Sequence, residues 1–306
     1  MTILITGGTG SFGQAFAKEA LTHNPKKIII YSRDEFKQEL MSKELNNNRL
    51  RFFIGDVRDS ERLHRAFNGV DIVIHAAALK QVPACEYNPS EAVKTNILGA
   101  MNILNTAINC GVEKVVALST DKAVNPVNLY GATKAAAEKI FTAGNVYSQK
   151  GKTKLSLVRY GNVAGSRGSV IPFFESLIKQ GDIIMPLTDE RMTRFHIDLA
   201  DAINLVMIAL NEMKGGEIFV PKISSFKITE LIKFLGYCYS LQLTYKLIGI
   251  RQGEKLHETL ISNDEACKTY DCGKYYIISE DKLKKKKVDA DFSYVSNENE
   301  DWLYGY

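Results

Sequence analysis

Short apolar runs alternate with longer stretches of helical spacing through the first half of this chain. The runs lie at residues 3–6, 27–31, 51–54, 72–75, 114–118 and 155–160. Between them, at residues 13–21, 60–67, 89–110 and 131–147, apolar side chains recur at the spacing of one helix face. Strands that are apolar throughout and are separated by helices form a parallel sheet covered on both faces. The pattern therefore predicts an α/β fold with a doubly wound parallel sheet.

A glycine-rich turn, Gly7-x-x-Gly10-x-x-Gly13, joins the first apolar run to the first helical stretch. Glycines at this spacing allow a tight turn, close approach of a pyrophosphate and close packing of the helix on the strand, and the helix N-terminus offers N–H groups to the anion. Glycine spacing alone is a weak signal, but its position between strand and helix predicts a dinucleotide site in a Rossmann-type domain. The cofactor residues expected in this turn are Gly7, Thr9, Gly10, Ser11, Phe12 and Gly13.

The end of the second strand bears on the choice of dinucleotide. No acid stands there to bind a ribose 2′-hydroxyl, and Arg33 can pair with a 2′-phosphate, so NADP is favoured over NAD. The alternative is that Arg33 is a surface residue paired with Asp34 or Glu35. Further cofactor contacts are expected from Ser32, Asp56, Val57, Ala76, Ala77, Ala78 and Lys80. Asp56 is also of a residue type that forms turns.

Tyr130 and Lys134 are four residues apart, so on a helix they share one face and can both address the nicotinamide end of a cofactor. A tyrosine that takes a proton from a sugar hydroxyl must first be a phenolate. Moving its pKa from about 10 to about 7 takes about 4 kcal/mol, which nearby cations can supply. A Tyr-x-x-x-Lys spacing alone is common by chance. Together with the glycine turn and the strand ending at Thr120, it predicts hydride chemistry.

In combination, these motifs resemble the extended short-chain dehydrogenase/reductases that modify nucleotide sugars, and among them the inverting UDP-N-acetylglucosamine 4,6-dehydratases. The resemblance covers nearly the whole chain and rests on residues 6–13, 32–35, 75–83, 159–163 and 251–255. Tyr130 and residues 125–129 before it resemble most the branch that opens pseudaminic acid biosynthesis, because capsule-pathway relatives often lack this tyrosine. The resemblance implies UDP-N-acetylglucosamine as substrate and a homo-oligomer, with a hexamer suspected.

A 4,6-dehydration needs an acid and a base beside the sugar. Once the C4 hydroxyl is oxidised, with Tyr130 taking its proton, the C5 proton becomes acidic and the C6 hydroxyl can leave. We expect Lys122 to remove the C5 proton and Asp121 to protonate the leaving hydroxyl, with Thr120 beside them. Retaining relatives commonly carry a glutamate at the position of Lys122, so the lysine favours inversion at C5.

These roles require a neutral Lys122 and a protonated Asp121. Lys134 and the oxidised nicotinamide are expected to lower the pKa of Lys122, and a closed apolar pocket to raise that of Asp121. The alternative interpretation is a local Asp121–Lys122 ion pair that stabilises a turn.

The helical stretch at 198–212 and the apolar run at 217–220 are assigned to the main sheet. We therefore predict a cofactor domain at residues 1–163 plus 196–220, and a smaller C-terminal α/β substrate domain at 164–195 plus 221–306. By the resemblance, the sugar nucleotide contacts Lys80, Asn162, Arg167, Arg194, Arg251 and Glu254. Glu258 is a weaker candidate near the tail.

Composition restricts the remaining functions. A net charge of +4 over 306 residues favours neither nucleic acid nor membrane binding, and no apolar run reaches transmembrane length. Five scattered cysteines without a CxxC pair indicate free thiols and a cytoplasmic protein, and the histidines lack metal-ligand spacing, so no metal is expected. The other hypotheses are a retaining dehydratase, a C4 epimerase of a UDP-sugar, and a non-catalytic NADP-binding sensor.

Overall fold

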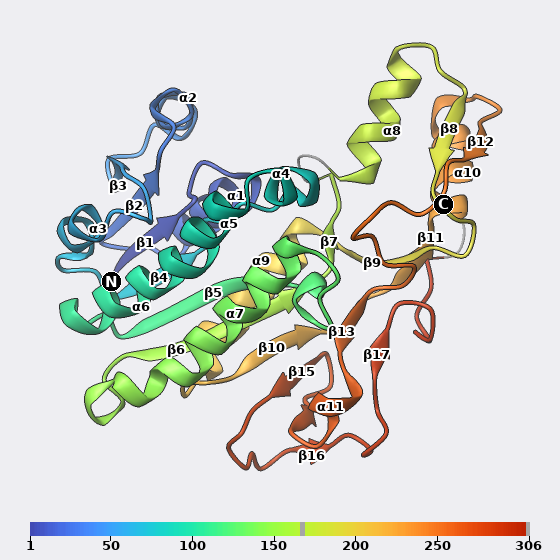
Figure 1. Cartoon of the computed structure of the whole chain (residues 1–306). Coiled ribbons are helices and arrows are strands. Elements are labelled where there is room, and N and C mark those ends of the chain that lie inside the picture. Colours follow the sequence, from blue (N-terminus) through green and yellow to red (C-terminus); the bar gives the residue numbers. More distant parts are fainter. Residues whose placement is uncertain (166–168, 304–306) are drawn as a thin grey trace.

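The centre of the molecule is a ten-stranded sheet in the computed structural model of the chain, which describes residues 1–165 and 169–303 (Figure 1). Seven of its strands are parallel neighbours in the order β3-β2-β1-β4-β5-β6-β10. In chain order they are β1 (Thr2–Thr6), β2 (Lys27–Ser32), β3 (Leu50–Ile54), β4 (Ile72–His75), β5 (Lys114–Thr120), β6 (Lys154–Tyr160) and β10 (Ile218–Pro221). This is the order of a doubly wound dinucleotide-binding sheet, and the predicted fold class is confirmed.

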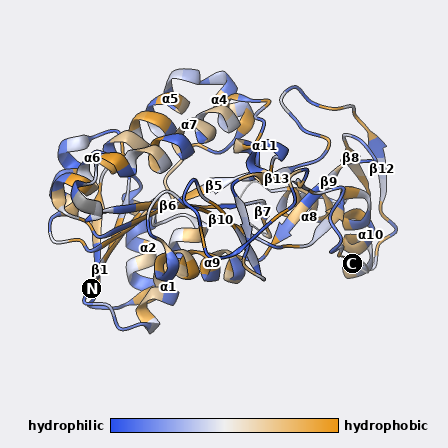
Figure 2. Cartoon of the chain, turned by 90° about the horizontal axis from the view of Figure 1, so that it is seen from below, coloured by the Kyte–Doolittle hydropathy of each residue, from blue (hydrophilic) through white to orange (hydrophobic). Residues whose placement is uncertain are grey.

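Helices cover both faces of the sheet (Figure 2). On one face α1 (Ser11–Thr22) contacts α9 (Leu199–Glu212), and on the other α6 (Gly99–Cys110) lies between α3 (Ser60–Phe67) and α7 (Leu129–Ala143). Strands β1 and β4 are buried at every position, which explains why their sequences are apolar throughout rather than alternating. The remaining elements of this half are α2 (Glu35–Leu45), α4 (Val82–Tyr87), α5 (Pro89–Val93), η1 (Lys94–Leu98), η2 (Asp121–Ala123), η3 (Gly144–Tyr147) and η4 (Gln149–Gly151).

Three antiparallel strands extend the sheet beyond β10: β15 (Tyr275–Ile278), β14 (Thr269–Asp271) and β16 (Lys286–Lys287). Ile277 and Ile278 pack into the main core. These strands lie in the segment expected for the smaller domain, yet they pair with the main sheet. The physical reason is the open edge of β10, whose backbone groups are paired by β15.

A second, smaller core lies apart from the large sheet and is formed by side chains of α8, β8, β11 and α10 (Figure 1). Its buried side chains include Phe174, Met185, Leu187 and Leu231. The elements of this part are β7 (Asn162–Val163), α8 (Val170–Lys179), β8 (Ile184–Leu187), β9 (Thr193–Ile197), β11 (Ser225–Lys227), α10 (Ile228–Tyr239), β12 (Thr244–Leu247), β13 (Thr259–Ile261), α11 (Asn263–Ala266) and β17 (Tyr294–Val295). Two cores agree with a two-part chain, while the predicted boundaries stay a prediction.

The six apolar runs predicted as strands coincide with β1 to β6 within two residues. The helix predicted over residues 89–110 is interrupted by the wider turn η1 between α5 and α6. There the buried Asn96 binds both backbone groups of Leu79, each at 2.9 Å, and donates to Thr133 Oγ1 at 3.0 Å. The wider turn thus lets the side-chain amide of Asn96 bind both α7 and the loop after β4.

Helix α2 has no counterpart among the predicted elements. Gln38 and Met41 are its buried residues, so it lacks a clear apolar face, and its N-terminus is marked instead by Asp34, which accepts a hydrogen bond from Lys37 N at 3.0 Å. Within the described ranges, no helix combines the length and apolar character needed to cross a membrane. All five cysteines are unpaired, as predicted.

Candidate active site

A cavity of about 1250 Å³ follows the carboxyl ends of the parallel strands and reaches the second core. Its walls combine the glycine turn, the ends of β2, β5 and β6, helix α8 and the loop at residues 251–255. This is the edge at which open α/β sheets bind ligands.

The glycine turn has the geometry that a dinucleotide needs. Gly7 has a φ of +64°, and a Cβ there would lie 2.9 Å from the backbone of Ala76 and Ala77. A Cβ at Gly13 would lie 2.6 Å from Gly8, which explains the close packing of α1 on the turn. Helix α1 starts at Ser11 without a side-chain cap among the described residues, so its first N–H groups face a cavity lined by Gly10, Ser11 and Phe12. The residues present fit a pyrophosphate group.

The predicted adenosine-binding residues also line the cavity. Ser32, Arg33, Asp56 and Val57 are among its walls, and the Arg33 side chain is 58% exposed. Arg33 Nη1 lies 3.7 Å from Asp56 Oδ2, whereas the alternative weighed from the sequence was a pair with Asp34 or Glu35. Ala76, Ala77, Ala78, Lys80 and Thr9 also line the cavity, and their contact with a cofactor stays a prediction.

Tyr130 and Lys134 share the cavity-facing side of α7, as their spacing predicts, and both are buried. Lys134 Nζ donates to the carbonyl of Leu118 at 2.7 Å. Burial lowers the pKa of Lys134 to about 8 against the opposing influence of Glu138. Burial likewise raises the pKa of Tyr130 to about 12, opposed by Lys122 and Thr120. The chain's own groups therefore do not produce the predicted shift of the phenol toward neutrality.

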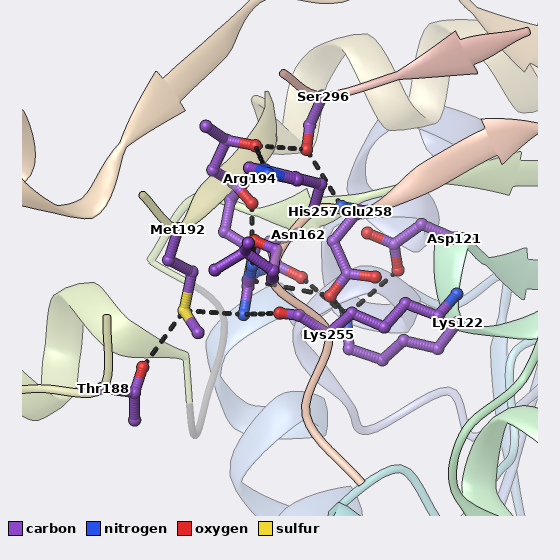
Figure 3. A network of polar contacts seen from close by, with 12 residues as sticks. Asp121, Lys122, Asn162, Thr188, Met192, Arg194, Lys255, His257, Glu258 and Ser296 are labelled. Atoms are coloured by element: carbon purple, nitrogen blue, oxygen red, sulfur yellow. Dashed lines mark hydrogen bonds and ion pairs between the residues drawn. The ribbon is translucent and has the colours of Figure 1, made fainter. Parts of the chain in front are cut away.

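Asp121 and Lys122 lie in η2, immediately after β5, and Figure 3 shows their side chains. Asp121 is fully buried, and its Oδ1 accepts hydrogen bonds from Thr120 Oγ1 at 2.9 Å and from Lys122 Nζ at 3.0 Å. Lys122 Nζ also donates to Asn162 Oδ1 at 3.3 Å and lies 3.1 Å from Glu258 Oε1. The local ion pair weighed as an alternative thus exists, within a larger cluster that faces the cavity.

The electrostatics of this cluster confirm one expectation and overturn another. Burial and the nearby Glu258 raise the pKa of Asp121, as predicted for an acid. Burial lowers the pKa of Lys122, but Asp121 and Glu258 outweigh it, so this pKa lies above its ordinary value. The predicted lowering was wrong for the chain alone, because two carboxylates contact the ammonium.

The residues predicted to bind substrate meet at the same cavity. Lys80, Asn162, Arg194, Arg251 and Glu254 line it, whereas Arg167 lies outside the described residues. Arg194 differs from the expectation of a free phosphate ligand. It is buried and donates to the carbonyls of Thr193, Leu256 and Lys255 at 2.7, 3.2 and 3.2 Å. Its contact with substrate stays a prediction.

Two further residues line the cavity, Lys255 and Glu258. From the sequence, Lys255 was not predicted as a site residue, and Glu258 was named only as a weaker candidate. Glu258 is buried, contacts Lys122 and lies 3.6 Å from Arg194 Nε. The charged run at residues 251–255 was a signal in the sequence, but nothing local links it to Asp121 and Lys122.

The histidines have structural partners. His75 is buried against Thr6 Oγ1 at 2.8 Å, and His257 Nδ1 lies 2.8 Å from Thr193 Oγ1. No cluster of three or more potential metal ligands occurs in the described parts of the chain. The expectation of no metal stays a prediction.

Comparison with known proteins agrees with this geometry. The profile of the family described as polysaccharide biosynthesis protein matches residues 3–280. The chain is 53% identical to the inverting UDP-N-acetylglucosamine 4,6-dehydratase of Campylobacter jejuni subsp. jejuni serotype O:23/36, over 98% of this chain and 93% of that protein. It is 49% identical to the UDP-glucose 4-epimerase of Rickettsia felis, over 92% of this chain and 83% of that protein.

Among solved structures, the X-ray structure of Pen from Bacillus thuringiensis superposes with a TM-score of 0.91 at 37% identity, covering 96% of this chain and 92% of that one. Sequence and fold comparisons thus agree over nearly the full length. The chain belongs to the polysaccharide biosynthesis protein family and shares the extended short-chain dehydrogenase/reductase fold with the inverting UDP-N-acetylglucosamine 4,6-dehydratases.

Proposed function

We propose that this protein is a C5-inverting 4,6-dehydratase of UDP-N-acetylglucosamine. The observation that carries the proposal is that Lys122 and Tyr130 line one cavity, beside a glycine turn that fits a dinucleotide, with the buried Asp121 bound to Lys122 Nζ at 3.0 Å. The relative at 53% identity bears the name of this activity. An acid and a base beside the tyrosine are what a dehydration needs and a simple oxidation does not.

NADP is the proposed cofactor, held by the turn from Gly7 to Gly13 and by Arg33. The exposed guanidinium of Arg33 at the cavity wall supports a 2′-phosphate contact, since arginine matches phosphate oxygens. A bound nicotinamide supplies an acceptor for the C4 hydride and a donor that returns hydride to C6. Lys134 would hold the ribose and nicotinamide end from α7.

The chain's own residues would move the protons. Tyr130 takes the proton of the C4 hydroxyl, for which Lys122 and a cationic nicotinamide must lower its pKa from the value set by burial. Asp121, whose raised pKa favours the protonated acid, gives its proton to the departing C6 hydroxyl. Lys122 in its neutral form takes the C5 proton, and inversion is completed when a proton returns to C5 from the opposite face. Asn162, Arg167, Arg251, Glu254 and Lys80 would hold the sugar nucleotide between the two proposed domains.

A second function, C4 epimerisation of a UDP-sugar, is favoured by the Rickettsia relative at 49% identity that bears that name. An epimerase uses the same tyrosine and lysine but does not need an acid and a base at Asp121 and Lys122. Retention at C5 is the other variant of the dehydratase. Analysis of the product separates all three reactions.

The test is proton NMR of UDP-N-acetylglucosamine incubated with the protein and NADP⁺ in D₂O, following C5 and C6. The expected product is a 4-keto, 6-methyl sugar with deuterium at C5 and the couplings of the L-arabino configuration. D-xylo couplings contradict inversion, and a galacto product shows an epimerase. Absence of any product contradicts the substrate or supports the sensor.

Three wider expectations are also proposals. The pseudaminic acid branch and the cytoplasmic location rest on the resemblance and on the unpaired cysteines, respectively. A homo-oligomer, a hexamer by resemblance, is supported by exposed apolar side chains on the α5–α6 side of the molecule, namely Val93, Leu98 and Met101. Light scattering of the purified protein tests the last of these.

A further inference from the structure

Glu258 reaches the active site from the far end of the chain. It immediately precedes β13, and its backbone is fixed by Ser296 next to β17: Glu258 N donates to Ser296 Oγ at 2.9 Å, and Ser296 N donates to the Glu258 carbonyl at 2.8 Å. The residue is 2% exposed. The C-terminal segment therefore holds a buried carboxylate against the end of β5, where Lys122 lies (Figure 3).

The two carboxylate oxygens of Glu258 have different surroundings. Oε1 lies 3.1 Å from Lys122 Nζ and 3.6 Å from Arg194 Nε. Oε2 is buried and has no hydrogen-bond partner among residues 1–165 and 169–303. A buried oxygen without a partner is costly, and such groups are retained where chemistry or a ligand needs them. The unpaired oxygen indicates that Glu258 does more than hold the C-terminal segment against Lys122.

Glu258 also completes the surroundings of the Lys122 ammonium. Nζ has three oxygen neighbours, Asp121 Oδ1 at 3.0 Å, Glu258 Oε1 at 3.1 Å and Asn162 Oδ1 at 3.3 Å. An ammonium has three N–H groups, so these oxygens satisfy it. They come from η2, from the segment before β13 and from β7, so Nζ is held from three separate parts of the chain.

We propose that Glu258 is a positioning residue that fixes Lys122 Nζ beside Asp121 and sets the pH at which Lys122 gives up its proton. The inference rests on the proposed function, in which Lys122 must be neutral to take the C5 proton. Within residues 1–165 and 169–303, the charged and titratable groups that interact with Nζ are Asp121, Glu258, Arg194, Lys255 and Tyr130. Asp121 and Glu258 favour the ammonium, and Arg194 and Lys255 oppose it.

Removal of the Glu258 charge should lower the pKa of Lys122. Burial, Arg194 and Lys255 remain and favour neutral lysine, while one of the two opposing carboxylates is lost. An opposite charge this close changes a pKa by about one to three units. In E258Q, Lys122 should therefore lose its proton at a pH lower by about one unit or more.

The experiment compares the NADP-loaded wild type with E258Q, E258D and the surface control E190Q, in which a glutamate that accepts a hydrogen bond from Tyr245 is changed. Two quantities are followed against pH: the rate of C5 deuterium incorporation, and the acetylation of Lys122 by acetic anhydride, measured by mass spectrometry. We expect both midpoints to move to lower pH in E258Q, while E258D and E190Q keep the wild-type midpoints. E258M removes the same charge in a side chain of similar length if E258Q does not fold.

A purely structural role gives a different result. E258Q would then lower kcat equally at every pH, with an unchanged acetylation midpoint, and this outcome overturns the inference. Failure of the proposed function is recognised separately, because the wild type would then form no 4-keto product. The acetylation midpoints still decide the role of Glu258 in that case.

Discussion

Two buried charge clusters lie close together in this molecule, and they differ in how completely their polar atoms are paired. In the first, Arg159 donates to Glu138 at 2.9 and 2.6 Å, to Glu265 at 2.9 and 2.8 Å, and to the Leu260 carbonyl at 2.9 Å. These bonds use every N–H direction of the guanidinium. The cluster joins β6, α7 and α11 and has no surface on the cavity that holds the active site.

The second cluster joins Lys122, Glu258 and Arg194, which line the cavity, to Asp121, which is buried behind Lys122. Asp121 Oδ2 and Glu258 Oε2 are buried there without hydrogen-bond partners in the part of the chain that the structure describes. A cluster that serves stability satisfies its atoms, because each unpaired buried group costs about 1–3 kcal/mol. The difference indicates that the first cluster stabilises α7, whereas the second keeps oxygens ready for a ligand or a proton.

The largest effect is expected from D121N. It removes the proposed acid while keeping the shape of the side chain, so kcat for 4-keto product formation should fall by about 10²–10⁴-fold. The amide keeps an acceptor oxygen for Thr120 Oγ1 and Lys122 Nζ, and Asp121 Oδ2 has no partner to lose within the described residues, so the melting temperature should change little. D291N, at an exposed site, is the matched control. A variant with wild-type kcat would show that the unpaired oxygen has no catalytic use.

R159M tests the other cluster and should mainly affect stability. Removing the guanidinium leaves the buried Glu138 and the partly buried Glu265 without their partner, and breaking a buried pair typically costs about 3–5 kcal/mol. Urea unfolding should show this loss, whereas R191M, which breaks an exposed pair with Asp189, should change the free energy of unfolding by less than about 1 kcal/mol. Equal losses in the two variants would contradict the assignment of the Arg159 cluster to stability.

The contrast between the clusters also explains what the sequence predicted well. The sequence could place Gly7, Gly13, Tyr130 and Lys134 at one cavity because each belongs to a short segment whose spacing alone defines the local geometry. The sequence did not indicate that β14 to β16 extend the main sheet, because pairing at the edge of β10 depends on which segment reaches it, and not on a local pattern.

The pKa shift of Lys122 was predicted with the wrong sign for a related reason. The predicted lowering rested on Lys134 and the cofactor, which a motif places near Lys122. It left out Glu258, which follows β12 in the chain and contacts Lys122 only in the folded protein. A pKa depends on all charges within several ångströms, irrespective of their distance along the chain. Residues that act across the fold are therefore the part of a site that a sequence motif reveals least.

The smallest expected effect concerns acid. Burial raises the pKa of Glu265, but the hydrogen bonds and charge of Arg159 outweigh it, so this pKa lies below its ordinary value. A carboxyl with a lowered folded pKa gives stability that is present above its unfolded pKa, near 4.3, and is lost as the pH falls through the folded value. The free energy of unfolding should therefore fall more steeply below about pH 5 in the wild type than in E265Q. Urea titrations at several pH values between about 3 and 6 measure the two slopes. Parallel slopes would mean that Arg159 holds Glu265 through geometry rather than charge, and the two clusters would then differ less than their hydrogen bonds suggest.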